Sequence, residues 1–438
     1  DDEPVGWINL PADAVVSVDG FSVTLPVKDA TDISFAVAKT LRVTPDADDA
    51  TGTGEAWDSP VSLPRALELA AGAGRILCKA GTYDITAPIV VRGTVSVEGG
   101  FAGTDDVTLA AEPVSVLDAQ GRSAVADVMT VTSETGSGNV LKRLCFRGGY
   151  RHGLNKTGAA PLAVHGCRFE ANGATAPESD VDMIYGRGLS CTGSGTETLI
   201  VSNCVFAGNV KTVIEGCAGY GFALGVRNLA RVVVDDTLFI TNGFNYAAPP
   251  RGQQLGRSGC GGTAIFAQNA PITARRCRFI ANHGMCYDEA VAGGIVRLAG
   301  AGGGSSFENC VWSGNEEPCG SDANGGGAVL ANGISGALSV SFDTTEATCD
   351  VIGCTFAYNL SDAWFAPAAV HLLKGTMTLR NSIVFGNLTS TGCRVGRDVY
   401  VRAAGSLSVD HTLFGTNEAD RIVAAEGATL TLGEGIKY

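Results

Sequence analysis

His283, Asp288 and Glu289 form the most suggestive group of side chains for acid–base chemistry in this sequence. An imidazole close to two carboxylates is a set that can donate and accept protons near neutral pH. The spacing of the three residues matches no catalytic motif. They are therefore candidate catalytic residues only if the surrounding elements bring them together.

The three candidates belong to a larger set of polar and aromatic residues that recur at one phase of a repeat, after an Asn and before a Gly-rich strand. Insertions at one phase of a solenoid gather on one face, which is often the binding face. The sequence therefore predicts a binding face. Its residues are Asp180, Asp182, Arg187, Tyr246, Arg251, Arg257, Tyr287, Glu316, Asp322 and Trp364.

A second group of carboxylates, Asp46, Asp48, Asp49 and Glu55, lies in a turn-rich acidic stretch. Calcium takes clustered carboxylates and carbonyl oxygens, so a Ca²⁺ site is one interpretation. The other is a solvated acidic turn, which the sequence favours. No metal and no other cofactor is predicted, and Ca²⁺ stays an open alternative.

The element that positions these residues is the frame Cys277-Arg-Phe279-Ile-Ala-Asn282. Seven further copies carry a small residue, an aromatic residue or Val two positions later, and an Asn three further on. Their final Asn residues are about 28 to about 44 residues apart, an interval typical of solenoids and propellers. The inward ladder predicted from the Cys-bearing copies contains Cys167, Phe169, Asn172, Cys204, Phe206, Asn209, Cys277, Phe279, Asn282, Cys310, Trp312, Asn315, Cys354, Phe356 and Asn359.

Each copy of the frame supplies three short strands. The small and aromatic positions point to one side of an extended strand, and the Asn sits where that strand turns. A second apolar run, such as Val232-Val-Val234, precedes the frame, and a Gly-rich entry into a third, such as Gly293-Gly-Ile-Val296, follows it. Three strands per copy predict an all-β fold, a single-stranded right-handed parallel β-helix whose coils stack about 4.8 Å apart.

Residues 1–43 alternate apolar and polar residues but lack the frame, which predicts a strand-rich arm or cap. Residues 44–438 form the predicted β-helix, and its first part, 44–74, is a capping turn and helix. Ser62 is the expected helix N-cap, Pro64 suits the first turn and Gly72 the end.

Tandem Phe-x-x-Asn units with Gly-Gly-Ala-Ile-like partners, over roughly residues 140 to 420, resemble the repeats of chlamydial polymorphic outer-membrane proteins and related bacterial surface β-helix proteins. The order of acidic turn, helix and Ala80-Gly-Thr-Tyr83 resembles the N-terminal cap of pectate-lyase-like β-helices. The resemblance implies the fold and carries no catalytic residue. The Asn-Thr-Asp, Gly-His-Gly and Arg-Ile-Lys motifs of polygalacturonases are absent, as is the Arg-x-Pro-x-x-Arg motif of pectate lyases.

Fourteen cysteines indicate an oxidising compartment, although those of the frame are equally explained as small core residues. Cys286 and Cys319 each follow the Asn of the frame by four residues, so in neighbouring coils they would lie next to each other. The coil spacing falls within the usual Cα separation of a disulfide, and a Cys286–Cys319 bridge is predicted. Cys349 is a further candidate for a loop disulfide.

The formal net charge of −14 argues against nucleic acid and anionic membranes as partners, because both require a basic surface. No apolar run reaches the roughly 18 residues of a membrane helix. An extracellular or outer cell-surface location is expected.

Two functional classes stay open. The favoured one is a non-catalytic surface protein, an adhesin or a structural subunit of an extracellular layer or filament. Its partners would be a host or matrix glycan or protein, or copies of itself joined head to tail. The alternative is a carbohydrate-active enzyme, a polysaccharide lyase or glycoside hydrolase that acts on an acidic polysaccharide; it rests on analogy of fold.

Overall fold

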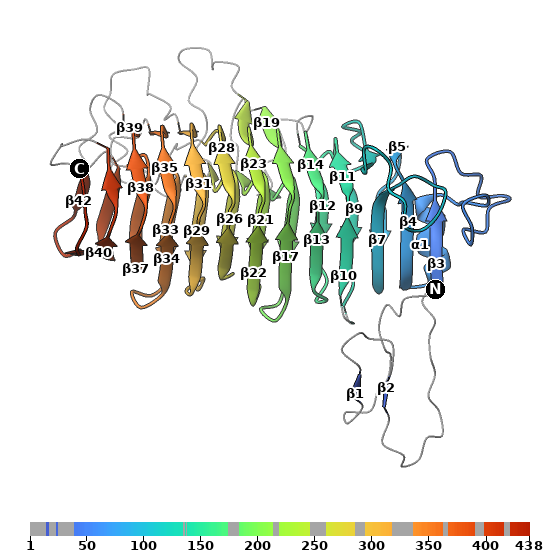
Figure 1. Ribbon diagram of the computed structural model, residues 1–438, viewed down its shortest axis with the longest axis horizontal. Helices are drawn as coiled ribbons and strands as arrows, with labels where there is room; N and C mark the ends of the chain where they lie inside the picture. The colour runs from blue at the N-terminus through green and yellow to red at the C-terminus, as the bar shows by residue number, and fades with distance from the viewer. Residues whose placement is uncertain are drawn as a thin grey trace.

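The computed structural model describes residues 15–16, 23–24, 39–134, 136, 138–173, 184–212, 219–245, 260–284, 294–317, 336–361, 367–389, 398–415 and 421–438. In this part of the chain, short parallel strands stack coil upon coil along one long axis (Figure 1). The chain is a right-handed parallel β-helix, as the repeat predicted.

Each coil contributes one strand to each of three sheets. Sheet 1 follows the loop after the Asn of the frame and contains β6 (Ile89–Val91), β9 (Asp127–Val131), β12 (His152–Lys156), β16 (Leu189–Thr192), β21 (Leu224–Arg227), β26 (Ile265–Gln268), β29 (Val296–Gly300), β33 (Leu338–Phe342), the first halves of β37 (Val370–Arg380) and β40 (Val399–Asp410), and β42 (Ile422–Ala424).

Sheet 2 precedes the frame. It contains β3 (Lys39–Val43), β4 (Ala73–Lys79), β7 (Thr94–Phe101), β10 (Asn139–Lys142), β13 (Leu162–His165), β17 (Thr198–Ser202), β22 (Arg231–Asp235), β27 (Ile272–Arg275), β30 (Ser305–Glu308), β34 (Thr348–Ile352), the second halves of β37 and β40, and β43 (Thr429–Leu432). β37 and β40 run from sheet 1 into sheet 2 with a register shift after Leu372, so the two sheets are hydrogen-bonded to each other there.

Sheet 3 carries the frame. Its 11 strands are β5 (Gly81–Asp84), β8 (Ser115–Asp118), β11 (Leu144–Arg147), β14 (Arg168–Glu170), β18 (Val205–Ala207), β23 (Leu238–Ile240), β28 (Arg278–Ile280), β31 (Val311–Ser313), β35 (Thr355–Ala357), β38 (Ile383–Phe385) and β41 (Leu413–Phe414). Shorter pairings involve β1 (Val15–Val16), β2 (Val23–Thr24), β15 (Ile184–Tyr185), β19 (Val210–Thr212), β20 (Gly219–Tyr220), β24 (Gly243–Asn245), β25 (Cys260–Gly261), β32 (Glu316–Glu317), β36 (Leu360–Ser361) and β39 (Leu388–Thr389).

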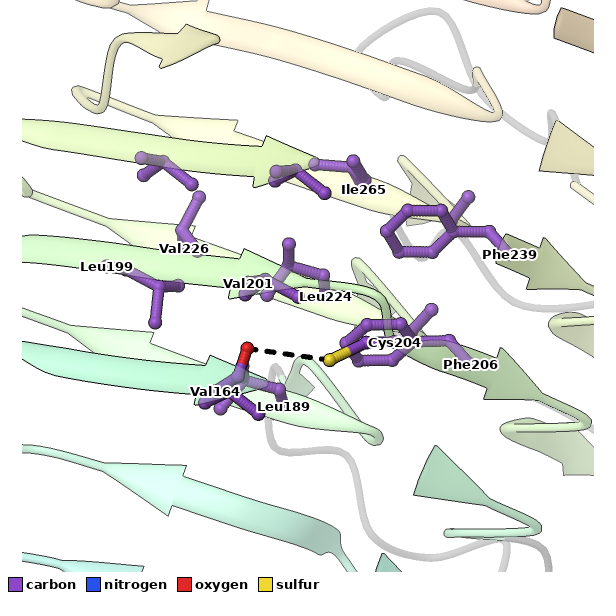
Figure 2. Packing of buried hydrophobic residues seen from close by; sticks show 14 of the residues in the cluster. Val164, Leu189, Leu199, Val201, Cys204, Phe206, Leu224, Val226, Phe239 and Ile265 are labelled. Atoms are coloured by element: carbon purple, nitrogen blue, oxygen red, sulfur yellow. Dashed lines mark hydrogen bonds between the residues drawn. The ribbon is translucent and has the colours of Figure 1, made fainter. Parts of the chain in front are cut away.

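The aromatic side chains of the frame form a continuous stack through the core. Phe206 and Phe239 lie one above the other with ring centroids 4.9 Å apart, against Val201 and Leu224 of the other two sheets (Figure 2). The stack extends from Phe146 through Phe169, Phe206, Phe239, Phe279 and Trp312 to Phe356, with centroid separations of 4.5–5.1 Å. Phe146 belongs to a copy that sequence reasoning missed, because Gly149 replaces its Asn.

The Asn residues of the frame form a second ladder, at the turn. In Asn282, Nδ2 donates to the carbonyl of Phe239 and to Oδ1 of Asn315, both at 3.0 Å. Oδ1 accepts from the backbone N and from Nδ2 of Asn242, at 3.1 and 3.0 Å. The buried amide therefore uses both of its donor hydrogens and both acceptor sites, which is the condition for burying a polar group at low cost.

The ladder repeats this bonding from Asn172 to Asn387 and ends on a carboxylate. Asn387 Nδ2 donates to Oδ1 of Asp398 at 3.1 Å, and Arg421 Nη1 donates to Oδ2 of Asp398 at 2.7 Å. The side chains of Asp398 and Arg421 are 0% and 7% exposed. A buried ion pair thus supplies the acceptor that the last amide of the ladder requires.

The small residues of the frame form a third ladder. Cys204 Sγ contacts the carbonyl oxygens of Ser202 and Val164 at 3.2 and 3.6 Å (Figure 2). Burial raises the pKa of Cys204 to about 12, so the thiol stays neutral. Cys167, Cys277, Cys310 and Cys354 are also buried, free thiols. Cys349 was expected in a loop; it lies in β34 instead, buried and free, because its strand alternation turns it toward the core.

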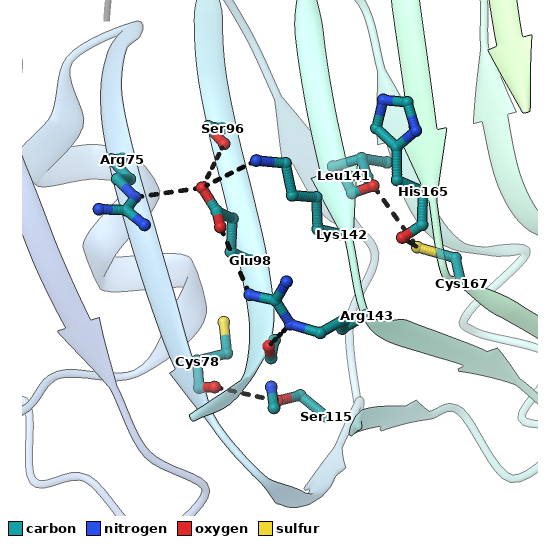
Figure 3. Close-up of polar contacts among 12 residues, drawn as sticks. Arg75, Cys78, Ser96, Glu98, Ser115, Leu141, Lys142, Arg143, His165 and Cys167 are labelled. Atoms are coloured by element: carbon teal, nitrogen blue, oxygen red, sulfur yellow. Dashed lines mark hydrogen bonds and ion pairs between the residues drawn. The ribbon is translucent and has the colours of Figure 1, made fainter. Parts of the chain in front are cut away.

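The outward face of sheet 2 is polar and charged. Glu98 lies among Arg75, Lys142 and Arg143, with N–O separations of 3.1, 3.6 and 3.4 Å (Figure 3). Burial of Glu98 opposes its ionisation, but these three cations outweigh burial and lower the pKa of the carboxyl. The carboxylate therefore stays ionised and joins three adjacent coils.

Helix α1 (Leu63–Ala70) closes the N-terminal end of the core. Ser62 Oγ accepts a hydrogen bond from the backbone N of Arg65 at 3.3 Å, and Ala71 ends the helix in the left-handed conformation, one residue before the Gly72 expected there. The helix buries Leu63, Ala66 and Ala70 against β3, β4 and β6. Strand β3 lies within the segment expected to be an arm, and it pairs in parallel with β4. No helix in the described residues is long and apolar enough to span a membrane.

Candidate functional site

His283 lies beside Glu316 at the turn of the frame. It directly follows Asn282, and its backbone bridges in parallel to Gly243 and Glu316. His283 Nδ1 lies 3.7 Å from Glu316 Oε2, and the two side chains are 39% and 52% exposed. This distance exceeds that of a hydrogen bond, and an exposed pair of this kind contributes little. Asp288 and Glu289 lie outside the described residues.

Of the predicted binding face, the structure describes Arg187 and Glu316. Glu316 is exposed, as expected for such a face. Arg187 is 1% exposed, which corrects the prediction: its guanidinium lies over the Phe222 ring at 5.7 Å, and Nη1 donates to the carbonyl of Gly173 at 3.1 Å. The side chain packs into the body of the protein because the aromatic ring and the carbonyl replace water around it. The other eight predicted residues, Asp180, Asp182, Tyr246, Arg251, Arg257, Tyr287, Asp322 and Trp364, fall outside the described residues, as do Cys286 and Cys319.

The outward face of sheet 1 carries a row of side chains that sequence reasoning did not identify. Strand pairing aligns them coil by coil, in the order Asn155, Ser190, Gly225, Phe266, Arg297, Ser339, His371 and Tyr400. Alternate residues of the same strands, such as Leu224 and Val226, belong to the core. The period of two therefore directs this row away from the core, although Phe266, Ser339 and His371 are only 4%, 1% and 0% exposed.

Arginine and aromatic side chains are paired along this face. The Arg227 guanidinium lies 4.4 Å from the centroid of the Tyr185 ring, and that of Arg297 lies 5.7 Å from the Phe266 ring. The Tyr185 and Phe266 rings are themselves 5.7 Å apart. Rings of this kind pack on the apolar faces of ligands, and guanidinium groups bind carboxylates with two parallel hydrogen bonds. We call Tyr185, Arg227, Phe266 and Arg297 the Arg–aromatic row.

A His–Asp pair lies on the same sheet, two coils before Arg227. His152 Nδ1 is 2.7 Å from Asp127 Oδ1, and Asp127 Oδ2 accepts from Asn155 Nδ2 at 2.9 Å and from Thr130 Oγ1 at 3.3 Å. Burial raises the pKa of Asp127, but the hydrogen bonds from His152, Asn155 and Thr130 prevail and lower it. An ionised Asp127 holds the proton of the imidazole on Nδ1 and leaves Nε2 as an acceptor.

This geometry suits His152 for proton transfer. The side chains of His152 and Asp127 are 12% and 16% exposed, and no partner of Nε2 is found among the described residues. A carboxylate that orients an imidazole in this way is the arrangement found behind many general bases. Sequence reasoning missed the pair because its members are far apart along the chain, and only the stacking of β9 on β12 brings them together.

Two carboxylates of the acidic turn, those of Asp48 and Asp49, accept local hydrogen bonds. Asp48 accepts hydrogen bonds from the backbone N of Ala50 and from Thr51 Oγ1, and Asp49 accepts from the backbone N and Oγ of Ser62. Within the described ranges, no three His, Cys, Asp or Glu side chains are grouped as a metal site. Asp48 and Asp49, two of the four carboxylates that suggested calcium, thus have protein donors as partners.

No protein-family model matches the chain, and no curated protein matches it in sequence. Among solved structures, it is similar to the DFA-IIIase from Arthrobacter chlorophenolicus A6 (13% identity, 91% of this chain and 99% of that one, TM-score 0.38). It is also similar to a PL6 alginate lyase in complex with a trisaccharide (10% identity, 92% and 85%, TM-score 0.34). A third is PfbA, a surface adhesin of Streptococcus pneumoniae (10% identity, 91% and 91%, TM-score 0.26). The neighbours include both enzymes and an adhesin, so the likeness is one of fold: the chain is a right-handed parallel β-helix protein.

Proposed function

We propose that the chain is a non-catalytic protein of the cell surface or the extracellular space that binds an acidic glycan on the outward face of sheet 1. The Arg–aromatic row is the observation that carries this proposal. The partly exposed Tyr185 ring offers flat apolar contact for a sugar ring, and the two partly exposed guanidinium groups offer partners for uronate or sulfate groups. The Phe266 ring is 4% exposed and packs against Arg297.

The repeats support the location. Tandem Phe-x-x-Asn units resemble those of chlamydial polymorphic outer-membrane proteins and related bacterial surface β-helix proteins. The net charge of −14 does not oppose this ligand, because anions are bound by local cations and distant charges are screened within about 10 Å at moderate salt. At moderate salt, binding to an acidic glycan should therefore depend on two or three local contacts.

Titration calorimetry with polygalacturonate, alginate and heparin fragments, beside neutral dextran, tests the proposal. Loss of a hydrogen bond to a charged group costs about 1.5–3 kcal/mol, and about 1.4 kcal/mol is tenfold in affinity. Arg227→Gln and Arg297→Gln should each weaken binding about tenfold or more. Arg231→Gln, at an exposed position of sheet 2 with the same change of charge, is the control and should bind normally. Equal binding by all three variants would refute the proposed site, and no binding to any acidic glycan would refute the ligand class.

The His152–Asp127 pair favours a second candidate, an enzyme that cleaves an acidic polysaccharide. Release of unsaturated products and of reducing ends should be measured on the same glycans. For an enzyme, His152→Ala should lower the rate on the order of a hundredfold or more, since general-base catalysis contributes that much. His165→Ala, on sheet 2, is the matched control. Absence of turnover by the unmodified chain would leave the binding role alone.

A further inference from the structure

The outward side chains of sheet 3 change character along the axis. In the first coils they are charged and paired: Arg147 bonds Asp118 at 2.7 Å, and Arg122 bonds Asp84 at 2.6 Å. From β23 to β41 the two outward positions of each strand are mostly apolar, and Arg278 is the only charged residue at them. The residues that change are the second and fourth of the frame. Because they face away from the core, packing of the core does not require them to be apolar.

The change ends in a group of exposed apolar side chains on β36, β38, β39 and β41 and directly after β35. We call it the apolar patch. Its members and their exposed fractions are Tyr358 63%, Leu360 38%, Ile383 42%, Phe385 39%, Leu388 58% and Leu413 42%. Soluble monomers rarely leave large apolar side chains exposed together, and such groups commonly mark interaction sites.

Strand pairing connects members of the patch. Ile383 pairs with Leu413 across β38 and β41, and Leu360 pairs with Leu388 across β36 and β39. The Tyr358 and Phe385 rings meet edge to face with centroids 5.6 Å apart. These pairs link the exposed side chains across three adjacent coils, with Leu360 and Leu388 on the short sheet that follows the Asn turn.

In the preceding coils, toward the N-terminus, half-buried apolar residues occupy the same outward positions of sheet 3. Leu238, Ile240, Ile280 and Val311 occupy the outward positions of β23, β28 and β31. Six strands about 4.8 Å apart, and about five residues across at about 3.3 Å each, give a strip of roughly 25 by 15 Å. Two such strips bury about 750 Å² in total, below the roughly 1,000 Å² of a stable specific interface. The strip is thus suited to a weak, transient contact and is too small for an obligate one.

We infer that a second copy of this chain docks on the strip, side by side, with sheet 3 packed on sheet 3. A long strip only about five residues wide matches a partner that is equally long and flat. The ridges of successive coils repeat at the β-strand spacing, so a second copy interdigitates with them over the whole length, as stacked sheets do. An isologous contact of this kind closes as a dimer.

The distribution of charged residues also favours the strip as the contact between two copies. At a net charge of −14 two copies repel each other, and the repulsion is smallest where the approaching surfaces carry few charges. Sheet 2 presents charged residues such as Asp235, Arg275 and Glu308 outward, whereas the strip presents only Arg278 at its strand positions. Added salt therefore strengthens the dimer, because it screens the repulsion and leaves apolar contact intact.

Sedimentation velocity of the full chain over the micromolar range, at low and high salt, tests the inference. The expected result is a monomer–dimer equilibrium that tightens with salt. The triple variant Ile383→Thr, Phe385→Thr, Leu413→Thr should weaken the dimer at least tenfold while its circular dichroism stays native, since all three side chains are exposed. Ile200→Thr, an exposed apolar residue of sheet 2, is the control and should dimerise normally.

Small-angle scattering distinguishes this dimer from a head-to-tail one. Side-by-side docking enlarges the cross-section and leaves the length almost unchanged, whereas head-to-tail docking doubles the length. A monomer at every concentration, a dimer of doubled length, or a dimer that the triple variant leaves intact would each overturn the inference.

Discussion

Replacing Asn282 by Ala should be among the most damaging single changes in the coils that contain it. The substitution removes four hydrogen bonds: two donated by Nδ2, to the carbonyl of Phe239 and to Asn315, and two accepted by Oδ1 from Asn242. Each lost bond costs about 1 kcal/mol, and a buried donor left without a partner costs about 1–3 kcal/mol. We expect a loss of about 4–6 kcal/mol, a large part of the 5–15 kcal/mol that stabilises a typical domain.

The measurement must resolve single coils, because a solenoid is stabilised by nearest-neighbour contacts and unfolds in parts. Urea denaturation followed by circular dichroism gives the overall midpoint. Hydrogen exchange then gives the local opening free energy of β23, β28 and β31, where protection should fall most. Asn309→Ala is the matched control: Asn309 is exposed and has a φ of 53°. Its replacement should cost at most about 1–2 kcal/mol, because Ala tolerates a left-handed backbone less well than Asn does.

Asn282→Asp separates the loss of donors from the loss of volume. The isosteric carboxyl keeps an acceptor toward Asn242, but when ionised it is a buried charge that faces the carbonyl of Phe239 and Oδ1 of Asn315. Burial raises its pKa in the folded state, so the variant should be most stable below the unfolded pKa of about 3.9 and lose stability as pH rises through the folded pKa. An Asn282→Ala variant no less stable than Asn309→Ala would refute the account of the ladder as a fully bonded network.

Three further results are expected. Asp398→Ala should destabilise the last coils by about 3–5 kcal/mol in urea denaturation, because it leaves the Arg421 cation buried without its carboxylate; a smaller loss than for Asp350→Ala, on the outward face of sheet 2, would contradict this. Burial opposes ionisation of Glu197, but Ser194 and backbone N–H donors prevail and lower its pKa to about 2. Its stabilisation should therefore be full above the unfolded pKa of about 4.3 and be lost as pH falls toward 2, a dependence that Glu197→Gln removes. Peptide mapping without reduction should show the predicted Cys286–Cys319 disulfide. Alkylation of the Cys286 thiol would exclude this bridge.

The fold could be predicted from the sequence because every coil of a solenoid must satisfy the same packing constraints. Each copy of the frame must bury the same three side chains, so the inward direction of Phe279 and Asn282 follows from alternation and turn position alone. Agreement among eight copies makes accidental matches improbable. Short-range chemistry also decided the cap, where Ser62 and Pro64 specify a helix start whatever the helix packs against.

The candidate binding surfaces depended on tertiary structure. His152 and Asp127 meet only because β9 and β12 stack in register, and the Arg–aromatic row forms because outward positions of different coils line up at the coil spacing. Loops between the strands vary in length, so the separation along the chain does not reveal which residues share a row. Arg187 illustrates the converse: its type and position suggested an exposed site, but burial depends on the ring of Phe222 in the next coil, which no local pattern encodes. Repetition determines the backbone, whereas contacts between coils decide which side chains meet.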